Sequence, residues 1–331
     1  MWIRIELHNH TIESDGTMTP TELSEFMAAQ EIPCFSLTDH NTISGLSQLP
    51  AACGDQIRYI FGYELTSYYG HMLCQNVSSY IPWDDIDSNN ADLLFHRVHE
   101  AGGLAGPAHP FSVPSPFSNG MRWDMNIHDP GLIDFIEIIN NAHPMIPDNY
   151  QAIQWWIHLS CSGFPIAPVS GLDLHGPMDL SGVFTTFIET EDNFSRFQNA
   201  SQLLAQAIRR CRTCVTRGPV LHWTLSGETL TLSLLPGLTP VPIQEPETEA
   251  SFFCIIKTEK DSLVIPIGNK DCHVSLPYTI RSSKGAVLLL FPAESFHSEQ
   301  LDFSYLTAVS GPIFFRVSSH QFNWWFYISP L

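Results

Sequence analysis

Apolar, β-prone runs alternate with helical patterns through the first two thirds of the chain, and this alternation constrains the fold more than any other feature. Strands that alternate with helices over residues 1–215 favour a parallel α/β fold, either open or barrel-like. The predicted strands are Trp2–Leu7, Cys34–Leu37, Ile57–Leu65, His71–Val77, Leu104–Ala108, Ile133–Ile139, Pro165–Val169 and Val183–Ile188.

The helices between these runs carry start and stop signals. Thr19, Pro20 and Glu22 form the pattern of an N-cap, a first-turn proline and a capping box. The Gly102-Gly103 pair is typical of a helix C-terminus. The predicted helices cover about 20–31, 91–101, 148–161 and 195–211.

The sequence changes character after about Gly218, where short β-like runs are separated by Pro and Gly as far as Trp324–Ile328. We therefore predict two domains, 1–217 and 218–331, the second a small all-β, sandwich-like appendage. The stretch 236–250, rich in Pro and Glu, reads as a loop or linker between strands.

The chain is strongly acidic, with 34 Asp and Glu against 15 Lys and Arg, for a formal net charge of −19. An acidic surface repels a phosphate backbone, which disfavours extended nucleic acid as a partner. A small anionic substrate is compatible with this charge if metal ions supply positive charge locally. Hydrophobic residues make up 44% of the chain, enough for a folded core.

No apolar run approaches the roughly 18 residues that a membrane span needs. The N-terminal residues also lack the apolar stretch of a signal peptide. These features predict a cytoplasmic protein with no membrane partner. The eight Cys are scattered along the chain, as expected of reduced, mostly buried thiols. The sequence sets no oligomeric state.

His8-Asn9-His10 follows the first predicted strand, and residues i and i+2 of a strand point to the same side. Alone, this pair could equally be a surface or capping pair. Other potential ligands lie at the ends of predicted strands or beside the turns next to them, at the edge where parallel α/β folds gather their functional groups. They are Asp15, His40, Glu64, His71, His109, Asp173 and His175.

Histidine and carboxylate ligands without cysteine suit Zn²⁺, Mn²⁺ or Fe²⁺. The set exceeds the needs of one ion, so we expect two or three divalent metal ions. Such ions share a bridging hydroxide that attacks a phosphoryl group, while the metals neutralise its charge. The pattern therefore predicts a metal-dependent hydrolase.

Four ordered motifs resemble those of the PHP (polymerase and histidinol phosphatase) family over about residues 1–190. They are Glu6-Leu7-His8-Asn9-His10-Thr11 with Ser14-Asp15-Gly16 and Thr38-Asp39-His40-Asn41-Thr42, then Gly62-Tyr63-Glu64, then His109-Pro110, and finally Asp173-Leu174-His175. A weaker similarity, at Arg217-Gly218-Pro219, is to a branch with carbaryl hydrolase-like members.

The resemblance implies a distorted (β/α)7, TIM-like barrel with a site for three metal ions. By position, His8, His10, Glu64 and Asp173 hold the first ion. Glu64 bridges to a second ion with His109 and His71, and Asp15, His40 and His175 hold the third. The resemblance also assigns the catalytic roles to His8, His10, Glu64, His109, Asp173 and His175.

The function expected from these features is hydrolysis of a phosphomonoester on a small metabolite. Two alternatives stay open: a carboxylic ester or carbamate hydrolase with the same site, and a catalytically idle module that binds a partner. Asn140, Arg122 and Arg217 are candidates for substrate contacts, with purely structural roles as the alternative. The sequence names neither the substrate nor the native metal.

Overall fold

The computed structural model describes residues 1–54, 57–113, 121–141, 147–191, 200–238, 251–296 and 301–315 of the chain. The helices are α1 (Pro20–Ala29), η1 (Ser44–Gln48), α2 (Leu49–Cys53), α3 (Ala91–Glu100), η2 (Pro130–Leu132), α4 (Pro147–Cys161), α5 (Ala200–Arg209), α6 (Tyr278–Arg281), η3 (Ala293–Ser295) and η4 (Phe303–Tyr305).

The strands alternate with these helices in the first two thirds of the chain and follow one another closely after it. They are β1 (Trp2–Ile5), β2 (Cys34–Leu37), β3 (Arg58–Ser67), β4 (Gly70–Gln75), β5 (Leu104–Pro107), β6 (Phe135–Asn140), β7 (Ala167–Gly171), β8 (Thr185–Glu189), β9 (Thr213–Thr216), β10 (Val220–Ser226), β11 (Thr229–Leu235), β12 (Phe252–Lys257), β13 (Ser262–Ile267), β14 (Cys272–Ser275), β15 (Gly285–Pro292) and β16 (Ala308–Phe314).

The helix signals in the sequence are confirmed. At the start of α1, the Thr19 hydroxyl accepts a hydrogen bond from the Glu22 amide, and the Glu22 carboxylate accepts one from the Thr19 amide. This capping box satisfies two backbone donors that a helix start otherwise leaves unpaired. The end of α3 is followed by Gly102 at φ +81°, a conformation that favours glycine.

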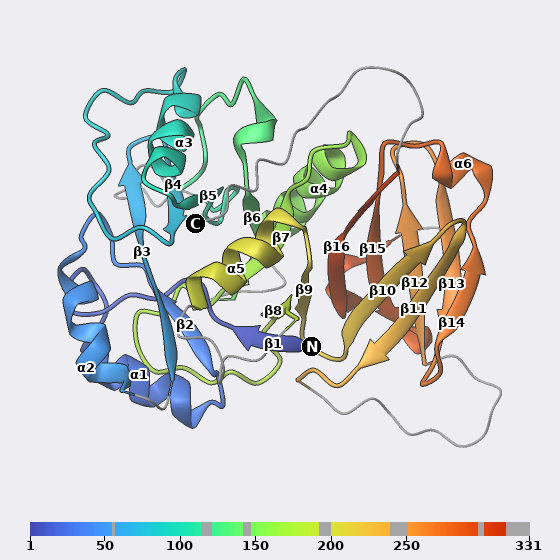
Figure 1. The fold of residues 1–331 in the computed structure, drawn as a ribbon, viewed down its shortest axis with the longest axis horizontal. Helices are drawn as coiled ribbons and strands as arrows, with labels where there is room; N and C mark the ends of the chain where they lie inside the picture. Colours follow the sequence, from blue (N-terminus) through green and yellow to red (C-terminus); the bar gives the residue numbers. More distant parts are fainter. Residues whose placement is uncertain are drawn as a thin grey trace.

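The strands form four sheets. A seven-stranded sheet has the order β1-β8-β9-β16-β15-β12-β13, and a four-stranded sheet has the order β2-β3-β4-β5. Two smaller sheets contain β6-β7 and β10-β11-β14. In Figure 1 the N-terminal elements lie to the left and the strands after β9 to the right, with α4 and α5 between.

The predicted (β/α)7, TIM-like barrel is wrong: within the described ranges, no run of paired strands closes on itself. Only β2–β3 and β6–β7 are parallel ladders there. A tight turn at Tyr68–Tyr69 makes β4 antiparallel to β3, and β1 and β9 both pair antiparallel with β8. Alternating strands and helices predict a parallel sheet. Here the β3–β4 hairpin and pairing between strands distant in the sequence set the strand directions instead.

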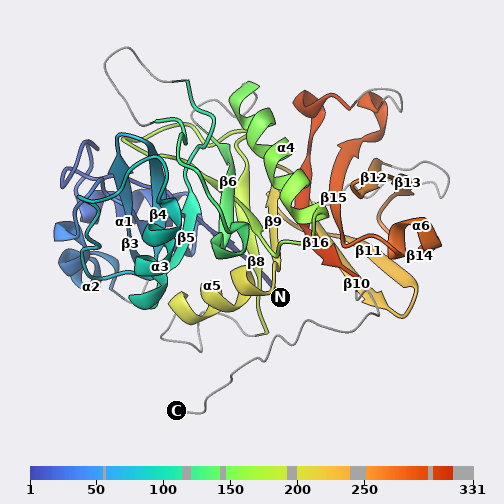
Figure 2. The same cartoon turned by 90° about the horizontal axis from the view of Figure 1, so that it is seen from above.

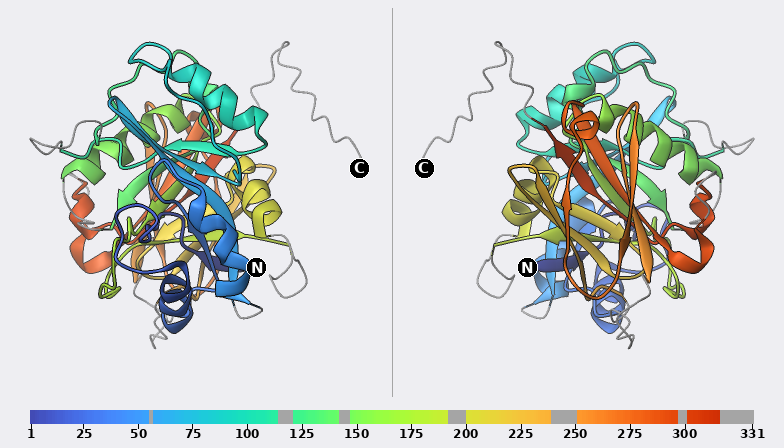
Figure 3. Two further views of the ribbon diagram at one scale, coloured as in Figure 1. Left: turned by 90° about the vertical axis from the view of Figure 1, so that its left-hand side faces the viewer. Right: turned by 90° about the vertical axis from the view of Figure 1, so that its right-hand side faces the viewer.

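Packing is continuous across the two regions of the chain. One core cluster includes Phe95 of α3 and Trp156 of α4 together with Val287 and Leu289 of β15. Figure 2 shows α4 between β6 and β15, and Figure 3 views the molecule from its two ends. A second cluster fills the space between strands of the C-terminal region.

The seven-stranded sheet crosses the predicted boundary at 217, because β9 pairs with β16 at Val215↔Val309. The division into 1–217 and 218–331 stays a prediction. The run at Trp324–Ile328 and residues 239–250 of the predicted linker lie outside the described residues. No helix in the described part of the chain is long and apolar enough to cross a bilayer.

Close packing of β5 on β6 gives a testable requirement at Gly106. A Cβ at Gly106 would overlap the backbone oxygen and the ring of Phe135. We expect Gly106→Ala to lower the free energy of unfolding by about 3 kcal/mol, because overpacking forces backbone shifts. Urea denaturation measures this loss.

The control is Gly268→Ala, because a Cβ at Gly268 has no atom within 4 Å. It should change the free energy of unfolding by less than about 0.5 kcal/mol. Equal denaturation midpoints for the two variants would contradict the packing argument.

Candidate metal centre

Side chains that lie in or directly after six strands meet at one point of the structure. His8 and His10 follow β1, His40 follows β2, and His109 follows β5. Glu64 and His71 lie within the β3–β4 hairpin, and Asp173 and His175 follow β7. Isolated bridges, Asn9↔Leu174 and His40↔Glu64, hold these strand ends side by side. The structure thus brings together all nine predicted ligands, including Asp15 from the turn after His10.

The first ligand group consists of His8, His10, Glu64 and Asp173, whose ligand atoms all lie within 4.8 Å of one another. Asp173 Oδ1 lies 3.3 Å from His8 Nε2 and 3.0 Å from His10 Nε2. Glu64 Oε2 lies 3.2 Å and 3.4 Å from the same two nitrogens. This geometry suits a single cation at the centre of the four.

The other carboxylate oxygen of Glu64 faces a second pair of imidazoles. Glu64 Oε1 lies 2.9 Å from His71 Nδ1 and 3.1 Å from His109 Nε2. His40, Glu64 and His71 also satisfy the distances of a ligand group. Glu64 therefore has the position of a carboxylate that two metal ions could share.

A third group contains Asp15, His40, His175 and His10. Asp15 oxygens lie 3.2 Å from His175 Nε2, 3.7 Å from His40 Nε2 and 3.8 Å from His10 Nδ1. The side chains of Asp15 and His175 are 56% and 41% exposed, whereas that of Glu64 is fully buried. The third group therefore forms the open side of the centre.

Several buried ligand atoms have no hydrogen-bond partner: His8 Nε2, His10 Nδ1 and Glu64 Oε2. A buried polar atom without a partner costs free energy, so native structures rarely leave one. These three atoms point toward the ligand groups just described. Their lack of partners fits a site that holds divalent cations.

The electrostatics of the centre agree with this fit. Burial raises the pKa of Glu64, but the positive imidazoles of His8, His71 and His40 outweigh it and hold that pKa well below the ordinary value. Conversely, burial lowers the pKa of His8, yet the carboxylates of Asp173, Glu137 and Glu64 raise it well above the ordinary value. The negative potential that raises the pKa of His8 would equally attract a metal ion.

Two candidate ligands have strained backbones. His109 has φ +27° and Asp173 has φ +50°, in the left-handed region that non-glycine residues seldom occupy. Such conformations persist where surrounding contacts enforce them, and they cluster at functional sites. Here they turn both side chains inward directly after β5 and β7.

The sequence reasoning missed Glu137, a fully buried carboxylate in β6. Glu137 Oε1 accepts a hydrogen bond from His8 Nδ1 at 3.0 Å, and Glu137 Oε2 accepts one from the His109 amide at 2.6 Å. The first bond leaves His8 Nε2 free to act as a ligand. A signal existed in the sequence, since Glu137 interrupts an otherwise apolar run.

Glu137 also explains the glycine at position 171. A Cβ there would overlap Glu137 Oε1 and the Cβ of His8. A second buried carboxylate, Glu6, accepts hydrogen bonds from the amides of His8 and Leu172. Burial raises the pKa of Glu6 to about 7.

Other residues noted in the sequence have identifiable positions. Asn140 Nδ2 donates to Asp173 Oδ2 at 2.9 Å, which places Asn140 beside the centre. Asp39 accepts hydrogen bonds from Thr11 and Ser14 and so orders the turn that carries Asp15. Arg122 follows Met121, whose carbonyl lies 3.1 Å from His109 Nδ1.

Arg217 does not point into the centre. Its guanidinium lies 5.1 Å from the centroid of the Phe184 ring and donates to the Ser304 carbonyl. Neither contact involves a residue of the ligand groups: Phe184 directly precedes β8, and Ser304 lies in η4.

Comparison with known proteins gives similarities of limited extent. No protein-family model matches the chain. Over 124 residues the chain is 37% identical to a 3′,5′-nucleoside bisphosphate phosphatase from Chromobacterium violaceum, a match that covers 36% of this chain and 43% of the relative. Over 65 residues it is 35% identical to a 5′-3′ exoribonuclease from Haemophilus influenzae, covering 19% of this chain and 24% of the relative. The matched regions therefore span less than half of either relative.

Among solved structures, the chain is similar to a two-domain protein from Bacteroides vulgatus that contains a predicted PHP-like metal-dependent phosphoesterase. The TM-score is 0.53 at 16% identity, and the match covers 88% of this chain and 90% of the other. This coverage includes strands beyond residue 217, so the fold is shared across both regions. The resemblance to PHP-like proteins is confirmed, whereas none of these comparisons shows a carbaryl hydrolase branch.

The Glu137–His8 contact yields a prediction about metal affinity. Glu137→Gln keeps the shape of the side chain but removes its charge, and we expect it to weaken binding of Mn²⁺ by about 10- to 100-fold. Equilibrium dialysis with metal analysis measures the affinity, and ¹⁵N shifts of the His8 ring in the metal-free protein report its tautomer.

Glu191→Gln is the matched control, because this carboxylate is 88% exposed and pairs only with Arg210 among the described residues. It should leave the affinity unchanged. An unaltered affinity in Glu137→Gln would show that His8 needs no orienting carboxylate.

Proposed function

We propose that the chain is a metal-dependent phosphoesterase that hydrolyses a phosphomonoester on a small molecule. One observation carries the proposal: nine His, Asp and Glu side chains converge around Glu64, and three buried ligand atoms among them have no hydrogen-bond partner. The similarity to a nucleoside bisphosphate phosphatase supports the same reaction class.

We assign the first ion to His8, His10, Glu64 and Asp173. Glu64 would bridge to a second ion with His71 and His109, and the exposed Asp15 group would hold a third. The donor set suits Zn²⁺, Mn²⁺ or Fe²⁺. When bound, such ions supply positive charge for phosphoryl oxygens and activate water as a nucleophile.

Residues around the centre would orient the metal ligands and leave one side open to the substrate. Asn140 fixes one oxygen of Asp173, and Glu137 fixes the ring of His8, so both ligands are held before metal or substrate arrives. The exposed side of the centre, at Asp15 and His175, gives the substrate its approach. His175 is half exposed there, and its Nε2 lies 3.2 Å from Asp15 Oδ1.

The substrate we propose is nucleotide-sized. The relative from Chromobacterium violaceum is named for nucleoside bisphosphates, and the net charge of −19 disfavours a long polyanion. The exoribonuclease relative makes a short RNA the second candidate.

The first experiment measures phosphate release by the Mn²⁺-reconstituted protein from a nucleoside 3′,5′-bisphosphate, with a short RNA and a carboxylic ester in parallel. We expect release from the bisphosphate, lowered about 1,000-fold by Asp173→Asn. Losing a metal ligand removes several kcal/mol of charge stabilisation, and 1.36 kcal/mol corresponds to a factor of ten.

Asp84→Asn is the control, because Asp84 is exposed and distant in sequence from every ligand. It should retain full activity. Ester cleavage without phosphate release would favour the ester hydrolase alternative. If no substrate reacts although the metal is bound, the phosphoesterase proposal fails and partner binding gains support.

A second prediction concerns the number of ions. We expect Asp15→Ala to bind one ion fewer than the unaltered chain, because Asp15 is the only carboxylate of the third group. Metal analysis after gel filtration counts the ions per chain. Equal counts in the two proteins would rule out a third ion that depends on Asp15.

A further inference from the structure

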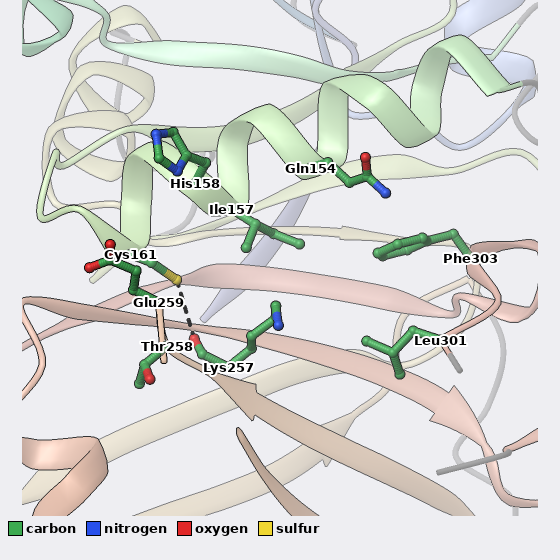
Figure 4. A pocket seen from close by; sticks show the side chains of 9 residues that line it. All are labelled: Gln154, Ile157, His158, Cys161, Lys257, Thr258, Glu259, Leu301 and Phe303. Atoms are coloured by element: carbon green, nitrogen blue, oxygen red, sulfur yellow. Dashed lines mark hydrogen bonds between the residues drawn. The ribbon is translucent and has the colours of Figure 1, made fainter. Parts of the chain in front are cut away.

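A pocket of about 390 Å³ lies apart from the metal centre, between α4 and the end of β12. Figure 4 shows it lined on one side by helix α4 and on the other by Lys257, Thr258 and Glu259 at the end of β12 and by Leu301 and Phe303. Ligand pockets typically occupy about 300–1,000 Å³, so this one has room for a small molecule. The lining residues are Gln154, Ile157, His158, Cys161, Lys257, Thr258, Glu259, Leu301 and Phe303.

Lys257 supplies the positive charge of this pocket. Its side chain extends into the space between Ile157 and Leu301 (Figure 4). Among the residues that the structure describes, no carboxylate lies within the 4.0 Å of an ion pair with its amine. The chain has only 15 Lys and Arg against 34 acidic residues, so a lysine with no ion-pair partner among the described residues leaves its positive charge available to a ligand.

The backbone of Lys257 is fixed on both sides. It pairs with Ser262 of β13 and Val287 of β15, and its carbonyl accepts a hydrogen bond from Cys161 Sγ at 3.4 Å. The amine therefore reaches the pocket from a rigid base. A preorganised charge of this kind binds a ligand with little loss of backbone entropy.

The rest of the lining defines the ligand. Ile157, Leu301 and Phe303 form an apolar wall beside the amine, which suits a hydrocarbon group. The carboxylate of Glu259 lies on the opposite side, next to Cys161 (Figure 4). A second negative charge on the ligand would be repelled by Glu259, so one charge is favoured over two.

We propose that this pocket binds a small organic monoanion, namely a monocarboxylate with an apolar chain. The carboxylate pairs with the Lys257 amine, the amide of Gln154 is available as a further hydrogen-bond donor, and the chain packs on Ile157, Leu301 and Phe303. This site is separate from the metal centre and does not depend on the proposed hydrolase activity.

Octanoate is the probe, with octylamine and octyl phosphate as charge controls. Calorimetry of the full chain gives affinities, and methyl resonances of Ile157 and Leu301 report where the probe binds. We expect octanoate to bind and to shift both methyl groups, octyl phosphate to bind more weakly, and octylamine not to bind.

Variants then test the role of the amine. Lys257→Met keeps the length of the side chain without its charge and should weaken octanoate binding at least about 10-fold. Lys257→Arg should retain binding, and Lys260→Met, at an exposed lysine outside the lining, should not alter it. The methyl spectrum also shows whether each variant is folded.

Three results would overturn the proposal. The first is that octanoate does not bind even at a concentration of about 10 mM, since a dissociation constant above this value would be too weak for a specific site. The second is equal binding by Lys257→Met and the unaltered chain. The third is tighter binding of octyl phosphate or octylamine than of octanoate.

Discussion

The carboxylate of Glu64 is the group on which the centre depends. Its side chain is fully buried and lies within 3.4 Å of imidazole nitrogens from five histidines. A buried carboxylate is stable only if positive charge or hydrogen bonds compensate for lost hydration. Here the compensation comes from β1, β2, β4 and β5 at once, so these strand ends must meet at Glu64.

The carboxylates around this centre have different tasks. Glu64 and Asp173 face the imidazoles, whereas Glu137 and Glu6 lie behind His8 and hold its ring and its backbone. Glu137 lies in β6, and Glu6 also accepts a hydrogen bond from Leu172 directly after β7. The ligands are therefore positioned by β6 and β7 as well as by the strands that carry them. Helix α4 contributes too: Asn149 in its first turn exchanges two hydrogen bonds with the backbone of Asn140, which in turn holds Asp173.

Much of the centre could be predicted because the end of a strand can be recognised from a few consecutive residues of the sequence. His8, His10, Asp173 and the other ligands follow β-prone runs, and local pattern is enough to find them. Glu137 was missed because it lies inside β6, before the end of the predicted strand, and belongs to none of the motifs. Its partner, His8, lies 129 residues away, and pairing over such a distance leaves no trace in one sequence.

The closed barrel was predicted wrongly for a related reason. The periodicity of apolar residues identifies a strand but not its neighbour in the sheet. Alternation of strands with helices predicts parallel neighbours, whereas β1, β4 and β9 pair antiparallel. The short turn between β3 and β4 was visible in the sequence and indicates a hairpin. The pairing of β9 with β16, across at least 91 intervening residues, was not visible at all.

The β9–β16 ladder has a consequence for how this fold could be shortened. In a chain that ended after Thr216, β9 would keep β8 on one side and expose its other edge, with unpaired amide and carbonyl groups, to solvent. Exposed edges of this kind recruit strands from other molecules and promote aggregation. The C-terminal strands thus cover an edge of β9 that a shortened chain would expose, so the two regions should be expressed and engineered together.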